Sequence, residues 1–249
     1  WVSLKNGDGK RLLHIRSEMI NFPSDAEAEI RSERDIAPRE DLPGFHIELV
    51  LGMTGKLYVI LPTQLDLEIP FAINAPFLQD PARSGLKDIA LSPTNRWLLQ
   101  KSGELAATLM TKWLQNSDLS NEDRAKAYRL LISPGGDETT VSKQLRSIVQ
   151  KGFIHGIDAD RILLSEKGLV TAKNRCRALP REIMDVWSEK QLKDYFGDIS
   201  QHILCRSVSS VAIDILARYG LLVRTSKNDI ISKLKNKKPP RPETYLKIF

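Results

Sequence analysis

The apolar residues of this chain change their spacing at Ser92-Pro93, and this change constrains the fold more than any other feature. Before it, apolar and polar residues alternate in short runs, which is the period of β-strands. After it, Leu98, Leu105 and Leu109 recur at helical spacing, which predicts a long helix over about 94–116. The sequence therefore predicts an α+β fold: a sheet with helices over the first 90 or so residues, followed by a mainly α-helical region.

Three extended segments precede the long helix. Segments 44–53 and 56–63 are predicted to pair as a hairpin, because Thr54-Gly55 between them has the spacing and the chemistry of a tight turn. A third segment, 66–74, contains Pro70, which indicates an edge strand or a bulge because proline cannot donate to a sheet.

Further elements are predicted on both sides of this region. Residues 10–20 alternate enough to form a strand, and 24–34 begin with Ser24 as a cap and acidic residues in the first turn, which predicts a helix. Residues 161–168 are strand-like. The other predicted helices cover 120–132, 141–154 with its end at Gly152, 181–196, 208–220 with its end at Gly220, and 226–236.

These elements are expected to form three parts. Residues 1–118 are predicted to be an α+β domain, 119–240 a helical domain, and 241–249 the start of a truncated continuation. The chain starts at Trp1 without a methionine and stops in an apolar segment, so both ends are expected to have been cut from a longer protein.

The positive charge of the chain is concentrated near its C-terminal end. There are 37 basic and 31 acidic residues, a formal charge of +6, and residues 224–249 hold eight basic residues against two acids. This tail is a candidate contact for nucleic acid or an acidic partner. The residues proposed for that contact are Lys233, Lys235, Lys237, Lys238 and Arg241. The alternative is a solvated linker with a stiff, proline-rich end.

The sequence lacks the short motifs of the common catalytic sites, among them the P-loop, the nucleophile elbow and the zinc-protease helix. Cys176, Cys205 and four scattered histidines have neither disulfide-framework nor zinc-site spacing. Cys176 is interpreted as an inert reduced thiol, although its flanking arginines would activate it if it were exposed. No apolar run approaches the roughly 18–20 residues that span a bilayer. A cytoplasmic protein without a membrane partner, and without a cofactor or metal site of its own, is expected.

One loop displays a single arginine between the predicted sheet and the long helix. Arg83 lies in a polar stretch that follows the segment at 66–74 and precedes a helix beginning near Asn95. Arginine suits phosphate because its planar guanidinium donates two parallel, charge-assisted hydrogen bonds. Arg83 is therefore a candidate functional residue, and the alternative is a surface arginine paired with Asp80.

Residues 57–100 resemble the segment that follows the ATP-binding domain in sacsin-like GHKL ATPases, which are distantly similar to the ninety-kilodalton heat-shock chaperones, MutL and the type II topoisomerases. The matching pieces occur in the same order as in that group, and a looser likeness extends to the C-terminus. They are Leu61 to Thr63, Pro70-Phe71, Asn74 to Phe77, Arg83-Ser84, and Asn95 to Leu98.

The resemblance implies a function as well as a fold. In such ATPases an N-terminal domain binds ATP and Mg²⁺, and a transducer domain of the βαβ-sandwich type supplies a basic residue to the γ-phosphate. Arg83 is the candidate here, and its cation would couple hydrolysis to domain closure. The motifs of the ATP-binding domain itself have no match, so this chain alone is not expected to bind ATP tightly or to hydrolyse it. The implied partners are its own ATP-binding domain and a second copy in a homodimer; bacterial relatives include defence-associated proteins.

Two other functions remain open at this point. Residues 124–170 have the rhythm of a winged-helix DNA-binding module, with Lys143, Arg146 and Lys151 on the basic face of a recognition helix. Against this, Gly135-Gly136 stands where a second helix is needed. The third interpretation is a protein-interaction scaffold inside a larger protein, with the helical half as its binding surface.

Overall fold

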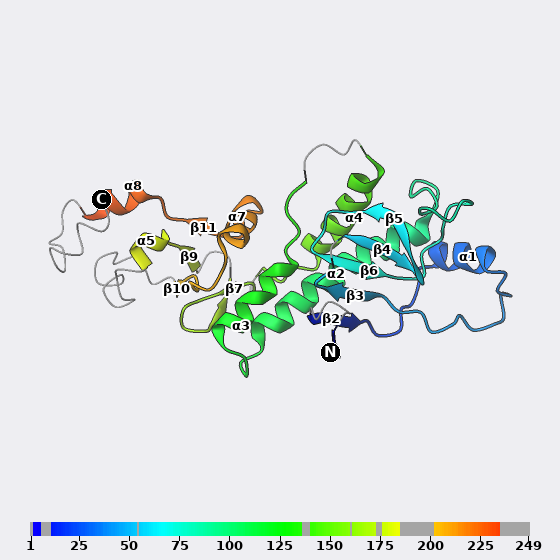
Figure 1. Ribbon diagram of the computed structural model, residues 1–249, viewed down its shortest axis with the longest axis horizontal. Helices are drawn as coiled ribbons and strands as arrows, with labels where there is room; N and C mark the ends of the chain where they lie inside the picture. Colours follow the sequence, from blue (N-terminus) through cyan, green and yellow to red (C-terminus); the bar gives the residue numbers. More distant parts are fainter. Residues whose placement is uncertain are drawn as a thin grey trace. The chain divides into compact units, whose positions relative to one another are not determined.

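The chain forms two compact units, and each is described here by itself. A computed structural model describes residues 2–5, 11–53, 55–135, 140–159, 161–172, 176–184 and 202–234. The first unit comprises Trp1–Leu109 with Leu130–Ile157, and the second comprises Met110–Arg129 with Asp158–Phe249. Strands and helices occur in both, so the predicted α+β class is confirmed (Figure 1). The domain limits predicted after residues 118 and 240 stay predictions.

A six-stranded mixed sheet is the centre of the first unit. Its strands are β1 (Val2–Lys5), β2 (Arg11–Arg16), β3 (Glu48–Leu51), β4 (Lys56–Val59), β5 (Leu61–Asp66) and β6 (Phe71–Asn74). They lie in the order β1-β2-β3-β6-β4-β5, and only β4 and β6 run parallel. Leu49, Leu57, Phe71 and Ile73 are fully buried on these strands, so the core lies against the middle of the sheet.

The hairpin predicted from 44–53 and 56–63 is wrong. β6 lies between β3 and β4 and pairs with both, so these two segments do not pair with each other. The hairpin at this place is β4–β5, which reverses at Ile60 inside the segment predicted as one strand. Ile60 adopts a left-handed φ of 71°, a conformation that hairpin turns usually assign to glycine or asparagine. Because an apolar residue stands there instead, the sequence of this segment shows no sign of the turn.

The interpretation of Pro70 as a sign of an edge strand or a bulge is also wrong. β6 starts at Phe71 and is a central strand, paired antiparallel with β3 and parallel with β4. Pro70 immediately precedes it, where its missing N–H removes no hydrogen bond from the ladder. A proline directly before a strand is therefore compatible with a central strand.

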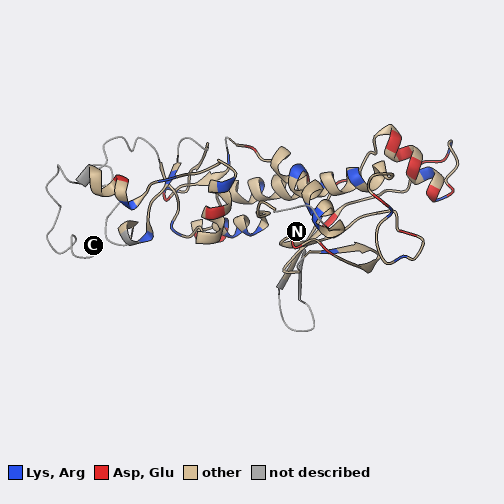
Figure 2. Cartoon of the chain, turned by 90° about the horizontal axis from the view of Figure 1, so that it is seen from above, with Lys and Arg blue, Asp and Glu red and all other residues tan. Residues whose placement is uncertain are grey.

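Three helices complete the described part of the first unit, and α2 and α4 lie on one face of the sheet (Figures 1 and 2). They are α1 (Ser24–Glu33), α2 (Pro93–Gln115, whose last residues belong to the second unit) and α4 (Val141–His155). The long helix predicted over 94–116 is confirmed. Ser24 is the first helical residue of α1 instead of its cap, since Pro23 holds the cap position. Acidic residues are concentrated on α1 (Figure 2).

Glycines allow α2 and α4 to touch through their backbones. A Cβ atom on Gly152 would lie 2.0 Å from the carbonyl oxygen of Gln100, and one on Gly103 would lie 2.0 Å from that of Val149. Gly152 was predicted to end its helix, but α4 continues to His155. Gly152 therefore serves close helix packing, and the prediction of a helix end there is wrong.

The described part of the second unit contains short strands that were not predicted. It contains a parallel three-stranded sheet in the order β10-β9-β11 and an antiparallel pair, β7–β8. These strands have two or three residues each, too few to show a period in the sequence. Its elements are α3 (Asn121–Ala125), a 3₁₀ turn (Lys126–Leu130), β7 (Leu163–Leu164), β8 (Val170–Thr171), β9 (Cys176–Ala178), α5 (Arg181–Met184), β10 (His202–Ile203), α7 (Ser210–Arg218), β11 (Val223–Arg224) and α8 (Lys227–Leu234).

Several predicted boundaries in this unit are confirmed. Ser120, with which a helix was predicted to open, caps α3 by accepting a hydrogen bond from the N–H of Asp123. Ser209, which was not predicted as a cap, caps α7 in the same way, and the helix starts at Ser210 instead of 208. α7 ends before Gly220, which has a left-handed φ of 66°. Of the helix predicted over 181–196, only α5 lies within the described residues.

A buried arginine joins three segments of the second unit. The Arg124 guanidinium donates from Nε to the Leu114 carbonyl at 2.7 Å and from Nη1 to the Gly168 carbonyl at 2.8 Å. Asn121 Oδ1 is a longer third acceptor at 3.4 Å. Leu114 lies in the last turn of α2, so Arg124 satisfies a helix-end carbonyl and holds the β7–β8 turn beside it.

The structure supports an inert Cys176, and this leads to a testable expectation. The side chain is 1% exposed on β9, and burial raises the pKa of its thiol to about 12. We expect iodoacetamide at pH 8 to leave Cys176 unlabelled in the native protein and to label it fully in guanidinium, as measured by peptide mass spectrometry. Equal labelling rates in the two states would show that the thiol is accessible.

Candidate functional site: the Arg83 loop

The loop that carries Arg83 is closed by hydrogen bonds within itself. Gln79 and Leu86 form an isolated antiparallel bridge at its base. At its tip, both carboxylate oxygens of Asp80 accept hydrogen bonds from Ser84, one from the backbone N–H at 2.9 Å and one from the hydroxyl at 3.1 Å. The Arg83 N–H donates to the Asp80 carbonyl at 3.0 Å. The tip is therefore a compact turn whose shape does not depend on the Arg83 side chain.

Arg83 itself is exposed at this tip. Its backbone φ is 56°, a left-handed conformation that is uncommon for a residue other than glycine. Among the described residues, its guanidinium has no hydrogen-bond or ion-pair partner, and the alternative pair with Asp80 is not formed. The Asp80 carboxylate instead accepts hydrogen bonds from Ser84 on both of its oxygens.

Asn95 attaches the loop to the start of α2. This side chain is fully buried and makes three hydrogen bonds, all of them with the loop backbone. Its Oδ1 accepts from the Leu78 N–H at 2.8 Å, and its Nδ2 donates to the carbonyls of Leu78 at 2.8 Å and Lys87 at 3.1 Å. Asn95 thus holds both ends of the loop with one rigid amide.

A charged network braces the same region against α1. Lys87 pairs with Glu29 at 3.0 Å and with Glu33, and Glu29 also accepts from Ser92 and from the Thr94 N–H. Burial acts to raise the pKa of Glu29, but the hydrogen bonds outweigh it and hold that pKa below its ordinary value. The hydrogen bonds to Glu33 and Glu29 raise the pKa of Lys87. Both groups are therefore charged at neutral pH.

The loop also contacts the edge of the sheet. The Gln64 N–H on β5 donates to the Ser84 carbonyl at 3.0 Å. The loop is thereby fixed to a strand, to the start of α2 and to α1, while the Arg83 guanidinium stays available to an incoming group. An arginine alone has no proton to exchange near neutral pH, so this arrangement can bind a phosphate or a carboxylate but cannot act as a general acid or base.

The other predicted contact residues are not brought into this site. Lys233 lies in α8 of the second unit. Lys235, Lys237, Lys238 and Arg241 lie outside the described residues, so the nucleic-acid role of the tail stays a prediction.

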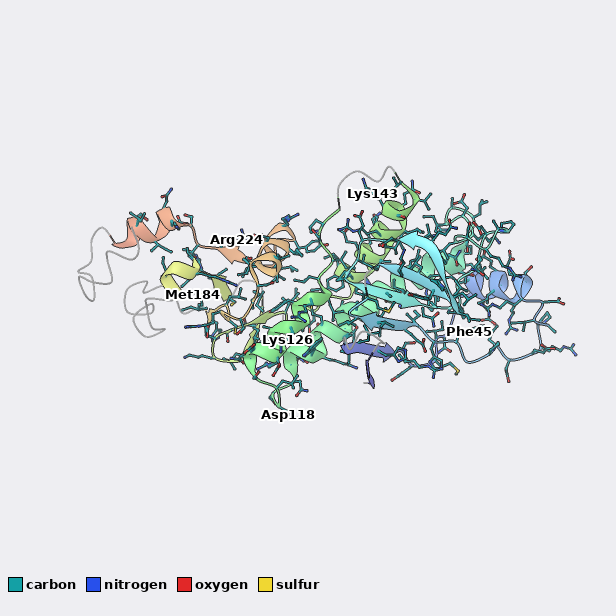
Figure 3. All side chains as sticks on the ribbon, viewed as in Figure 1. Phe45, Asp118, Lys126, Lys143, Met184 and Arg224 are labelled. Carbon is teal, nitrogen blue, oxygen red and sulfur yellow. The ribbon has the colours of Figure 1, made fainter. Side chains whose placement is uncertain are left out.

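The basic face proposed for a winged helix is partly used inside the first unit. Arg146 is only 13% exposed, donates to the Ser133 carbonyl at 2.7 Å and lies 4.0 Å from Glu68. Lys143 lies near the start of α4 (Figure 3), and Lys151 is exposed on the same helix. The helix and the β7–β8 pair, which would be the wing, belong to different compact units. The contacts of Arg146 with Ser133 and Glu68 favour a structural role for this side chain.

Sequence reasoning missed one feature of the first unit, a cavity where several strands end. It is lined by charged side chains that are far apart in the sequence, among them Arg16, Arg34 and Glu48. No motif marks it, because these residues come from β2, from the end of α1 and from β3. A cluster of this kind becomes visible only when the strand order is known.

Comparison with known proteins does not identify a class for this protein. No protein-family model, curated protein or solved structure matches this chain. In the part of the chain that the structure describes, no helix combines the length and apolarity needed to cross a bilayer. The same residues include no group of three or more histidine, cysteine or acidic side chains placed to hold a metal ion.

Proposed function

We propose that this chain is the transducer, or coupling, part of a GHKL-type ATPase, and that Arg83 contacts the γ-phosphate of ATP held by a separate ATP-binding domain. The observation that carries this proposal is the exposed guanidinium of Arg83, which has no partner among the described residues and lies on a loop that is held by β5, α2 and α1. The resemblance over residues 57–100 supplies the family. ATP and Mg²⁺ belong to the other domain in this proposal, and the present chain supplies the cation.

The braced loop suits a coupling role for a mechanical reason. A guanidinium that binds a phosphate transmits force only if its own backbone cannot yield, and Asn95 and Lys87 connect this backbone to α2 and α1. Engagement of Arg83 would therefore draw the whole first unit toward the bound nucleotide. Release of the phosphate would remove the attraction and let the unit separate.

The finer fold assignment, a βαβ sandwich, is part of the proposal. The helices on one face of a mixed sheet support it, whereas β2 and β3, which flank α1 in the chain, pair antiparallel. The parallel pair β4 and β6 is connected through β5 and not through a helix, which differs from a simple βαβ unit. The proposal accordingly rests on the Arg83 loop more than on the topology.

The test is Arg83→Ala in the protein that carries both this chain and the ATP-binding domain. Because loss of a cation that stabilises developing charge costs about 100-fold or more in turnover, we expect ATP hydrolysis to slow by that order while nucleotide affinity changes little. Arg96→Ala, which removes another exposed arginine from α2, is the matched control and should hydrolyse ATP normally.

Two results would contradict the proposal at different points. Unchanged turnover in Arg83→Ala would remove Arg83 from the mechanism. Binding of ATP to the 249-residue chain alone at micromolar concentration would show that the nucleotide site lies in this chain and not in a separate domain. Isothermal titration calorimetry of the isolated chain measures the second result directly.

A further inference from the structure

A cavity of about 250 Å³ opens at one end of the six-stranded sheet. β2, β4 and β6 end beside it and β3 starts there, so it lies at the junction of four strands. Its polar lining comes from Arg16, Arg34, His46, Glu48 and Asn74, with Phe45 and Ile60 on its apolar side. The volume is below the range of about 300–1,000 Å³ found for drug-sized ligands, so it suits a single side chain or a small group.

Arg34 is a cation with most of its hydrogen-bonding capacity unused. Its Nη2 makes one long hydrogen bond, 3.4 Å, to the Pro76 carbonyl, and among the described residues no carboxylate pairs with it. The guanidinium carbon lies 4.9 Å from the centre of the Phe45 ring. A guanidinium stacked in this way keeps its in-plane N–H groups available for an anion.

The Phe45 ring that supports Arg34 is itself held in place. Phe45 meets Phe22 edge to face at 5.7 Å, and Phe22 packs on Trp97 of α2 at 5.2 Å. Phe45 precedes β3 in the chain and lies beside the strand ends (Figure 3). The aromatic stack connects the Arg34 platform to the core, so the guanidinium is oriented before any ligand arrives.

The one carboxylate in the cavity is already engaged. Glu48 Oε2 accepts from the Asn74 side chain at 2.8 Å, and the same carboxylate lies 3.8 Å from Arg16 and 3.5 Å from His14. Glu48 thus interacts with Arg16, whereas Arg34, the second arginine of the lining, has no part in this group. The cavity is therefore net positive on its Arg34 side and complementary to an anion.

An apolar lip adjoins the charged cavity. Ile60 is 91% exposed and Leu61 is 72% exposed at the tip of the β4–β5 hairpin. A left-handed φ is a genuine outlier for a β-branched residue, and neither burial nor turn preference explains an isoleucine here. Strain of this kind is kept where a side chain must be displayed, and exposed apolar side chains beside a charged pocket are typical of protein contacts.

We propose that this cavity and lip form a docking site for an acidic segment of a partner protein, with a carboxylate side chain bound by Arg34 and a neighbouring apolar side chain against Ile60 and Leu61. The positive charge at Arg34 favours a carboxylate as the bound group, and the small volume of the cavity admits only one side chain. The apolar lip favours a polypeptide over a free ion, because a free ion has no apolar group to place against it. The site is separate from the Arg83 loop and does not depend on the function proposed for it.

The test uses the full chain and two acetylated, amidated peptides that differ only in Leu-Glu-Leu against Leu-Gln-Leu at their centre. Nuclear magnetic resonance titration should show the glutamate peptide binding at millimolar concentration or below, and at least about tenfold more tightly than the glutamine peptide. Arg34→Gln should abolish this preference. Arg39→Gln, which removes the same charge from an exposed position outside the cavity, should retain it.

Ile60→Gly separates binding from folding. Glycine tolerates a left-handed φ, so this variant should melt at the same temperature as the parent or higher, while its affinity for the glutamate peptide falls several-fold. Equal binding of both peptides, or of neither, would overturn the proposal. Saturation of the Arg34 signals by inorganic phosphate, with no competition from the glutamate peptide, would overturn it in favour of a small-oxyanion site.

Discussion

Replacement of Gly152 by alanine is expected to lower the free energy of unfolding by about 3 kcal/mol, and the melting temperature by about 10 °C. The new Cβ atom would lie 2.0 Å from the carbonyl oxygen and 2.8 Å from the carbonyl carbon of Gln100. Both are backbone atoms of α2, so no side-chain rotation relieves the clash. The helices must separate, and every contact along their crossing weakens.

Thermal unfolding followed by circular dichroism measures this effect. Gly135→Ala is the matched control, because a Cβ atom there meets only side-chain atoms of Gln150 at 3.6 Å and Arg146 at 3.8 Å. We expect that control to stay within about 0.5 kcal/mol of the parent. If Gly152→Ala melts with the parent, α2 and α4 do not approach each other through their backbones.

Replacement of Asn95 by alanine is expected to cost about 2–3 kcal/mol, because it leaves the buried Leu78 N–H and the Lys87 carbonyl without their partner. The Leu78 carbonyl loses one of two hydrogen bonds and still accepts from the Lys87 N–H at 2.9 Å. The loss is local to the loop, so the Arg83 tip should open more often than the rest of the unit.

Limited proteolysis with trypsin reports this opening, since Arg83 and Lys87 are both cleavage points in the loop. The Asn95→Ala chain should be cut there much faster than the parent under native conditions. Asn116→Ala is the control: its side chain is exposed and accepts one hydrogen bond, from the Asp118 N–H at 3.1 Å. Equal cleavage rates in parent and Asn95→Ala would show that the amide does not hold the loop.

The two sets of expectations bear on different claims. Gly152 tests the packing of the first unit, whereas Asn95 tests the rigidity that the proposed coupling role requires. If Asn95→Ala loosens the loop and also slows ATP turnover in the protein with its ATP-binding domain, the two effects connect loop rigidity to function. If the loop is loosened and ATP turnover does not change, any role of Arg83 in hydrolysis does not require the hydrogen bonds from Asn95 to the loop.

Much of the local structure followed from local patterns. The long helix α2, the acidic first turn of α1, the Ser120 cap and the end of α7 before Gly220 each depend on a few neighbouring residues, and each was predicted. The position of Arg83 on a loop between strand and helix was predicted for the same reason. Periodicity and capping depend only on a short segment, so they can be predicted from the sequence.

The predictions of local structure were wrong where the conformation at a residue is set by contacts with residues distant in the sequence. Gly152 looks like a helix end, but it is required because Gln100 lies against it. Thr54-Gly55 looks like a hairpin turn, but β6 inserts between the two strands. Ile60 looks like the middle of a strand, yet the chain reverses there. In each case a packing contact overrides the local preference.

The sequence by itself determined the α+β class, most of the long elements and the candidacy of Arg83, because spacing and turn chemistry act within a few residues. Only the tertiary structure decided the strand order, the backbone contact of α2 with α4, the Asn95 brace and the cavity beside Arg34. These features join residues from separate elements, and their energies depend on distances that the chain acquires only when it packs. The Arg83 side chain was predicted from its type, but only the tertiary structure shows that Asp80 accepts from Ser84 on both oxygens and, among the described residues, forms no pair with Arg83.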